Sequence, residues 1–147
     1  MKQEPMTSIS IASDHAGFEY KEAIKSHLET KGIHVEDFGT YSTDPVDYPD
    51  FVRGAAQAVA NGQCLLGIII GGSGNEAIVA NRLTGIRCAV VWNINTAQLS
   101  KEHGNCNMIA IGQRMMAEAE AIAVVDTWLS SEFKGGRHQR RIDKIDG

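Results

Sequence analysis

The sequence has few of the cysteines that cross-link small proteins, since its 147 residues include only 3 of them. It also has only 3 prolines. Cys64, Cys88 and Cys106 form no Cys-x-x-Cys pair, which argues against a disulfide framework and against a structural zinc site, so no metal is predicted. A chain of this length buries roughly 68–70% of its unfolded surface without such links. We therefore predict one domain over residues 1–147.

Long apolar runs and excess positive charge are also lacking. No stretch approaches 18 consecutive apolar residues, and residues 1–5 lack the apolar segment of a signal peptide. We expect a cytoplasmic protein that does not bind membranes and whose residues 1–7 are flexible. The 14 Lys and Arg residues against 18 Asp and Glu residues give a net charge of −4, which disfavours a nucleic-acid partner.

Short apolar runs alternate with stretches of helical periodicity along the whole chain. Five runs have the length of strands: Ile9–Ala12, Ile33–Phe38, Leu65–Ile70, Arg87–Trp92 and Met108–Ile111. Several of them are apolar throughout, as expected for parallel strands with helices on both faces. The sequence therefore predicts a single-domain α/β protein, a doubly wound, Rossmann-like α/β/α sandwich with a five-stranded parallel sheet and a C-terminal helix.

Polar segments follow the predicted strands, at the edge where open parallel sheets bind ligands. Residues 13–17 read Ser-Asp-His-Ala-Gly, where Asp14 either caps a helix or contributes a carboxylate to a site. Residues 71–76 read Gly-Gly-Ser-Gly-Asn-Glu, before a helix predicted from about Asn75 to Leu83. This turn favours anion binding by backbone N–H groups. Glu76 then either compensates the helix dipole or acts as a general base, and the spacing does not separate these.

The end of the chain is basic although the protein is acidic. Residues 137–144 contain Arg137, His138, Arg140, Arg141 and Lys144. Arg137 and Arg141 are four residues apart, so on a helix they share a face, and paired guanidinium groups suit a phosphate. The alternative is a solvated basic helix.

The glycine turn also fits the loose dinucleotide fingerprint Gly72-x-Gly74-x-x-Ala77. The acidic ribose-binding residue should follow about 20 residues later, where this chain has Asn93 instead. We therefore predict no NAD and no other cofactor.

Taken together, the motifs resemble the ribose-5-phosphate isomerase B family, which includes the galactose-6-phosphate isomerase subunits. They run in order along nearly the whole chain: Asp-His at 14–15, Asp-Tyr-Pro at 47–49, the glycine turn at 71–75, Ala-Asn-Arg at 80–82, Glu-His at 102–103, Gly-x-Arg-Met at 112–115 and Arg-His-Gln-Arg-Arg-Ile at 137–142. The resemblance implies an aldose–ketose isomerase of the pentose phosphate pathway. It would interconvert D-ribose 5-phosphate and D-ribulose 5-phosphate through a cis-enediolate, without a metal.

The resemblance also implies a role for each site residue. Glu76 would move the proton between C1 and C2, Ser73 would bind or relay to a substrate hydroxyl, His103 would open the furanose ring, and Asp14 would hold the sugar hydroxyls. The remaining residues would bind the substrate: His15, Tyr48, Gly72, Gly74, Asn75, Asn105, Arg114, Arg137 and Arg141. Four of these would grip the phosphate: His15, Arg114, Arg137 and Arg141.

The glycine turn departs from both branches of that family. One branch has a cysteine base where this chain has Gly71, and the other reads Gly-Ser-Gly-Asn-Gly-Glu, with a glycine that is missing before Glu76. A displacement of the carboxylate by about 1 Å would cost roughly 100-fold in rate.

The family builds its site between two subunits, which implies a homodimer or a tetramer. His103 and Arg114 of one subunit would meet Asp14 and Arg137 of the other. The alternatives are an isomerase of allose 6-phosphate, galactose 6-phosphate or erythrulose 4-phosphate, and a non-catalytic protein that binds phosphorylated sugars.

Overall fold

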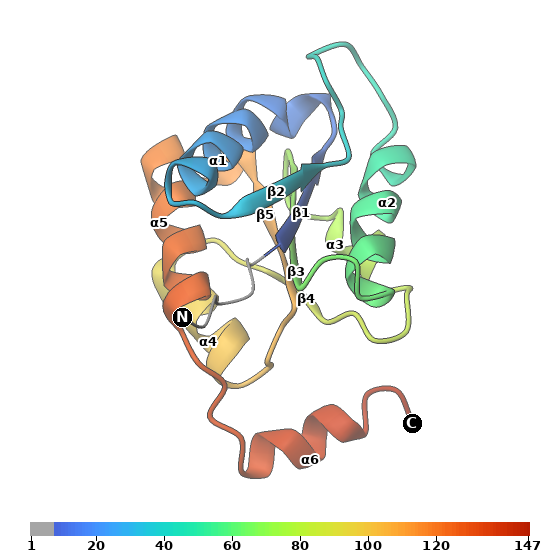
Figure 1. Ribbon diagram of the computed structural model, residues 1–147, viewed down its shortest axis with the longest axis vertical. Coiled ribbons are helices and arrows are strands. Elements are labelled where there is room, and N and C mark those ends of the chain that lie inside the picture. The colour runs from blue at the N-terminus through green and yellow to red at the C-terminus, as the bar shows by residue number, and fades with distance from the viewer. Residues whose placement is uncertain (1–7) are drawn as a thin grey trace, which may run out of the picture.

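The computed structural model describes residues 8–147, in which five parallel strands form one sheet of order β2-β1-β3-β5-β4 (Figure 1). The strands are β1 Ser8–Ser13, β2 His34–Asp37, β3 Leu66–Gly71, β4 Cys88–Val90 and β5 Met108–Gly112. Each begins and ends within two residues of a predicted run, and the predicted α/β fold with a five-stranded parallel sheet is confirmed. The expected flexibility of residues 1–7 lies outside the described residues.

Helices cover both faces of the sheet (Figure 1). They are α1 Phe18–Thr30, α2 Pro49–Ala60, α3 Ala77–Ala80, α4 Ile94–Glu102, α5 Glu118–Ser130 and α6 Arg137–Asp143, with short 3-10 helices at His15–Gly17 and Gln113–Met115. On one face α1, α4 and α5 pack around the fully buried Trp128. On the other, small residues of α2 and α3 pack against Ala12 and Ile69. The apolar strands are therefore buried on both sides, as their sequences predict.

The helix after the glycine turn is shorter than predicted. It spans only Ala77–Ala80, so the prediction of a helix from about Asn75 to Leu83 is wrong. The Asn81 side chain accepts a hydrogen bond from Cys88 N at 2.8 Å and donates one to Cys88 O at 2.9 Å. These bonds tie the helix end to the start of β4, so the chain leaves the helix after one turn.

The order of the strands creates a crevice between β1 and β3. The chain passes from β1 to β2 on one side and returns to β3 on the other side of β1, so the carboxyl ends of β1 and β3 lie next to each other, with Ser13 paired to Ile70. A Cβ atom at Gly17 would collide with the carbonyl oxygen of Ile70, so only glycine lets the segment after β1 pack this closely on β3. Ligands of open parallel sheets bind at such a switch point.

The C-terminal helix lies outside the sheet and the helices that cover its two faces. In Figure 1, α6 extends beyond the end of the sheet at which the strands begin, and none of its residues is buried. Within residues 8–147, no helix combines the length and the apolar character needed to cross a membrane.

Candidate active site

Asp14 and His15 lie directly after β1, where backbone contacts fix both side chains. Asp14 is buried, and its Oδ1 accepts a hydrogen bond from Gly17 N at 3.0 Å, so it does cap the 3-10 helix. Val46 N donates to His15 Nδ1 at 3.1 Å. A neutral His15 therefore carries its proton on Nε2, ready to donate to an anion.

These two residues line a cavity of about 460 Å³. The rest of its lining comes from the loop before α2 and the start of that helix: Val46, Asp47, Tyr48, Pro49 and Asp50. The structure thus brings together three of the predicted site residues, Asp14, His15 and Tyr48, around a space large enough for a sugar phosphate.

Glu76 lies at the end of the glycine turn after β3, and its carboxyl group points back over the turn. The residue is only 4% exposed, and its Oε1 accepts a hydrogen bond from Gly74 N at 3.2 Å. A Cβ atom at Gly71 would coincide with the Glu76 carboxyl group. The carboxyl group therefore fills the space that a side chain at position 71 would need. Gly74 has a φ of +90°, a backbone conformation that favours glycine and that shapes this turn.

The surroundings of Glu76 make it a stronger base than an exposed glutamate. Burial is the main cause that raises its pKa above the ordinary value, and the negative charge of Asp14 raises it further. The hydrogen bonds from the backbone N of Glu76 itself and from Gly74 N oppose the shift without cancelling it. A carboxylate with a raised pKa accepts a proton more readily near neutral pH.

Arg114 adds a positive charge beside the same turn. Its backbone N donates to Gly72 O at 3.0 Å, and its Nη1 would lie 3.2 Å from a Cβ atom at Gly72. Ser73 is exposed on the turn, and its Oγ accepts from Asn75 N at 3.4 Å. We call these residues the carboxyl-edge set: Asp14, His15, Tyr48, Gly72, Ser73, Gly74, Asn75, Glu76 and Arg114.

A second group lies at the opposite end of the sheet, where the strands begin. His103 ends α4, and its ring stacks on the His138 ring of α6, with centroids 4.2 Å apart and planes inclined by 13°. Lys134 N donates to Glu102 O at 3.0 Å, which ties the chain before α6 to the end of α4. We call His103, Asn105, Arg137, His138 and Arg141 the amino-edge set.

This grouping differs from the predicted one within a single chain. Arg114 follows β5 and lies beside Gly72, whereas His103 precedes β5 and lies beside α6, so one subunit does not bring the two residues together. The way in which two subunits share the site stays a prediction. Because α4 runs antiparallel to the strands after β4, its last residue lies at the end of the sheet where the strands begin. Arg137 belongs to α6, which extends beyond the end of the sheet at which the strands begin, whereas Asp14 follows the other end of β1 (Figure 1).

His138 was not among the residues assigned to the site. The sequence shows it only as part of the basic segment, and nothing in its spacing from His103 predicts that the two rings stack. The one available signal is the place of His138 in the Arg-His-Gln-Arg-Arg-Ile motif at residues 137–142, which carries part of the family resemblance.

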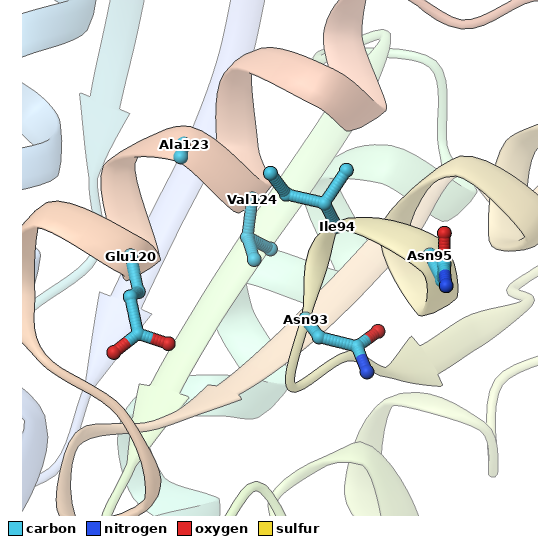
Figure 2. Close-up of a pocket in the computed structure, with 6 residues that line it drawn as sticks. All are labelled: Asn93, Ile94, Asn95, Glu120, Ala123 and Val124. Carbon is cyan, nitrogen blue, oxygen red and sulfur yellow. The ribbon is translucent and has the colours of Figure 1, made fainter.

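Another cavity, of about 350 Å³, lies between α4 and α5 (Figure 2) and is lined by Asn93, Ile94, Asn95, Glu120, Ala123 and Val124. None of these is a predicted site residue. The Asn93 Oδ1 accepts from Thr96 N at 2.7 Å and caps α4. Asn93 stands where a dinucleotide-binding protein has the acidic residue that binds the ribose, and here its side chain caps a helix instead.

Comparisons with known proteins agree on one family. Residues 9–145 match the family described as Ribose/Galactose Isomerase. A ribose-5-phosphate isomerase B of Mycolicibacterium paratuberculosis is 48% identical over 138 residues, which are 92% of this chain and 87% of that protein. The corresponding protein of Escherichia coli is 40% identical, over 95% of both chains.

Solved structures give the same result. A Clostridium thermocellum ribose-5-phosphate isomerase B superposes with a TM-score of 0.94 and 45% identity, over 95% of both chains. A Mycoplasma genitalium ribose-5-phosphate isomerase B with bound ribulose-5-phosphate superposes with a TM-score of 0.92 and 41% identity, over 97% of this chain and 96% of that one.

Proposed function

Since this chain belongs to the Ribose/Galactose Isomerase family, we propose that it interconverts D-ribose 5-phosphate and D-ribulose 5-phosphate, with Glu76 as the base. Its relatives with 40–48% identity are ribose-5-phosphate isomerases B, and their activity places the reaction in the pentose phosphate pathway. We assign the protein to the cytoplasm, where this metabolism runs.

The position of the Glu76 carboxyl group carries the proposal. In the cysteine branch of the family the base stands at position 71, and here the carboxyl group of Glu76 fills that space from the other end of the turn. The shortened turn thus still supports a base over Gly71. The raised pKa of Glu76 suits a group that must accept a proton from a carbon atom.

The reaction follows from this geometry. Glu76 takes the proton from C2 of the open-chain aldose, and the C2 electron pair forms a double bond to C1 while the C1 carbonyl oxygen becomes an oxyanion. The resulting cis-enediolate is stabilised by backbone N–H groups between Gly72 and Asn75. The O1 oxyanion takes the proton of the O2 hydroxyl, the O2 electron pair forms the C2 carbonyl, and the C1–C2 double bond takes the proton from Glu76 at C1, which gives the ketose. Asp14 and Tyr48 bind the sugar in the cavity after β1, and Ser73 binds it from the glycine turn after β3.

The two residue sets lie at opposite edges of one chain, so a complete site needs a second copy. We propose a homodimer in which the amino-edge set of one subunit completes the carboxyl-edge set of the other. His103 would open the ring, and Arg137 and Arg141 would bind the phosphate together with His15 and Arg114. Each subunit would then supply half of both sites.

Exposed apolar side chains around the glycine turn support this assembly. They are Ile78, Val90, Trp92 and Met115, which are 57%, 39%, 56% and 63% exposed. A Cβ atom at Gly74 would lie 2.9 Å from Val90 Cγ1, so this apolar surface begins at the turn itself. Large apolar side chains that gather on an exposed surface are typical of a protein–protein contact.

The experiment that tests the function is conversion of ribose 5-phosphate in deuterated water with excess chelator, followed by proton NMR. We expect turnover with loss of the C2 proton signal. Binding of ribose 5-phosphate without turnover or exchange would instead support a phosphorylated-sugar binding protein or another substrate. Parallel assays with allose 6-phosphate, galactose 6-phosphate and erythrulose 4-phosphate separate these alternatives.

A further inference from the structure

Arg87, just before β4, holds the loop that follows His103. Its Nε donates to Gly104 O at 3.0 Å and its Nη2 donates to Asn105 O at 2.7 Å. Its backbone N donates to Asn107 Oδ1 at 2.9 Å, and Asn107 Nδ2 donates to Gly85 O at 2.8 Å. Four hydrogen bonds thus join the 85–87 segment to the 104–107 loop.

The loop is tight and has an unusual backbone. Asn105 has a φ of +43°, the left-handed conformation that non-glycine residues adopt infrequently. A Cβ atom at Gly104 would lie 3.0 Å from both Cys106 Sγ and Ser100 O, so the chain closes on itself directly after His103. Such a conformation persists only when its surroundings hold it in place.

The Arg87 guanidinium binds this loop and no carboxylate among residues 8–147. Among residues 8–147, no ion pair joins Arg87 to a carboxylate. Its guanidinium instead binds two carbonyl oxygens just beyond the C-terminus of α4, where the helix dipole favours a positive charge. Charge-assisted hydrogen bonds of this kind are roughly twice as strong as neutral ones.

We propose that Arg87 is a positioning residue for ring opening, because it fixes the backbone that carries His103. The inference rests on the proposed function, in which His103 opens the furanose ring. His103 is then held in two ways: its backbone by the loop that Arg87 binds, and its ring by the stack on His138. Loss of the guanidinium frees the loop and lets the imidazole shift from the ring oxygen.

The role of Arg87 in ring opening can be measured separately from the role of Glu76 in proton transfer. Ring opening breaks the C1–O4 bond of ribose 5-phosphate, whose electron pair goes to O4. O4 takes a proton from the His103 imidazolium, while the anomeric hydroxyl loses its proton to water as the C1 carbonyl forms. D-ribulose 5-phosphate is open-chain, because the oxygen that would close its furanose ring carries the phosphate. Proton exchange at its C1 therefore needs the base but not ring opening.

The test compares two reactions in Arg87→Met and Arg87→Lys. One is turnover of ribose 5-phosphate, and the other is deuterium incorporation at C1 of ribulose 5-phosphate in deuterated water. We expect Arg87→Met to lower turnover of ribose 5-phosphate about 10–100-fold, as for a misplaced catalytic group, and to leave the C1 exchange nearly unchanged. Arg87→Lys keeps the positive charge but not the paired hydrogen bonds, so its turnover of ribose 5-phosphate should fall between those of the wild type and Arg87→Met.

Two further variants calibrate the result. His103→Asn should show the same selective loss as Arg87→Met, and Arg53→Met, which removes an exposed arginine of α2, should change neither reaction. Equal losses of turnover and exchange in both Arg87 variants would overturn the proposal, because they indicate a general structural role. Full turnover in Arg87→Met would overturn it as well. A wild-type protein inactive in both reactions would instead overturn the proposed function, and the role of Arg87 with it.

Discussion

The carboxyl-edge and amino-edge sets differ in how the fold holds them. Asp14 and Glu76 are only 8% and 4% exposed and follow two paired strands at the centre of the sheet. By contrast, His103 is exposed, and α6 has no buried residue. The proposed base thus lies where burial can shift its pKa, whereas Arg137 and Arg141, which we propose to bind the phosphate, lie on an accessible helix. In the proposed dimer, the buried half is fixed by its own chain, and the exposed half would become part of a site only with a second copy.

Removal of the base from the buried half should have the largest effect. Glu76→Gln is expected to lower turnover of ribose 5-phosphate by about 10³-fold or more, since general-base catalysis contributes up to about 10⁴-fold. Binding of a phosphorylated inhibitor, measured by calorimetry, should stay nearly intact because the phosphate contacts remain. A variant that keeps most of its turnover would assign the base to another residue.

The stability of the same variant provides the control for folding. Since burial raises the pKa of Glu76, its ionisation lowers the free energy of unfolding as pH rises above the ordinary glutamate pKa. Glutamine cannot ionise, so Glu76→Gln should melt at a higher temperature than the wild type at neutral pH. A lower melting temperature would mean that the loss of activity includes damage to the fold.

Mixing of two inactive chains tests whether the halves come from different subunits. Glu76→Gln damages one half and His103→Asn the other, so a mixed dimer regains one intact site and one doubly damaged site. After subunit exchange at equal amounts, turnover of ribose 5-phosphate should recover to about a quarter of the wild-type value. No recovery above the two separate variants, with mixed dimers shown by native mass spectrometry, would place each site within one chain.

Arg137 on the exposed half should affect binding more than chemistry. A phosphate contact is made equally in the ground and transition states, so Arg137→Ala should raise KM about 10–100-fold and change kcat little. Arg140→Ala removes the same charge from the same helix and is the matched control, with an expected KM close to wild type. An unchanged KM in Arg137→Ala would indicate that α6 is only a solvated helix.

The smallest expected effect is a shift of the pH profile. The acid limb of kcat/KM should lie above the ordinary glutamate pKa, because burial and the Asp14 charge raise the pKa of Glu76. Asp14→Asn removes that charge, so the limb should move to lower pH even though the rate itself falls. Asp44→Asn, in the exposed loop before α2, should leave the limb in place. If the acid limb of kcat/KM lies at the same pH in Asp14→Asn as in the wild type, the carboxyl groups of Asp14 and Glu76 do not interact.

The sequence predicted the sheet well because burial on both faces leaves a simple signature. The runs at residues 65–70 and 108–111 contain only apolar residues and glycine, and both form interior strands of the sheet. The helix after the glycine turn was overestimated, since its end depends on the contact of Asn81 with Cys88 seven residues later. Local periodicity carries no information about such a contact.

The amino-acid sequence shows which chemical groups are present and in what order: a carboxylate and an imidazole after β1, a glycine turn with Glu76 after β3, and a basic C-terminal helix. Which of these groups meet depends on the way in which the chain folds. Strand order brought Asp14 near Glu76, and the return path of α4 carried His103 to the opposite edge. The chemistry of a side chain is set by its own residue, whereas its neighbours depend on the direction in which each packed element crosses the sheet.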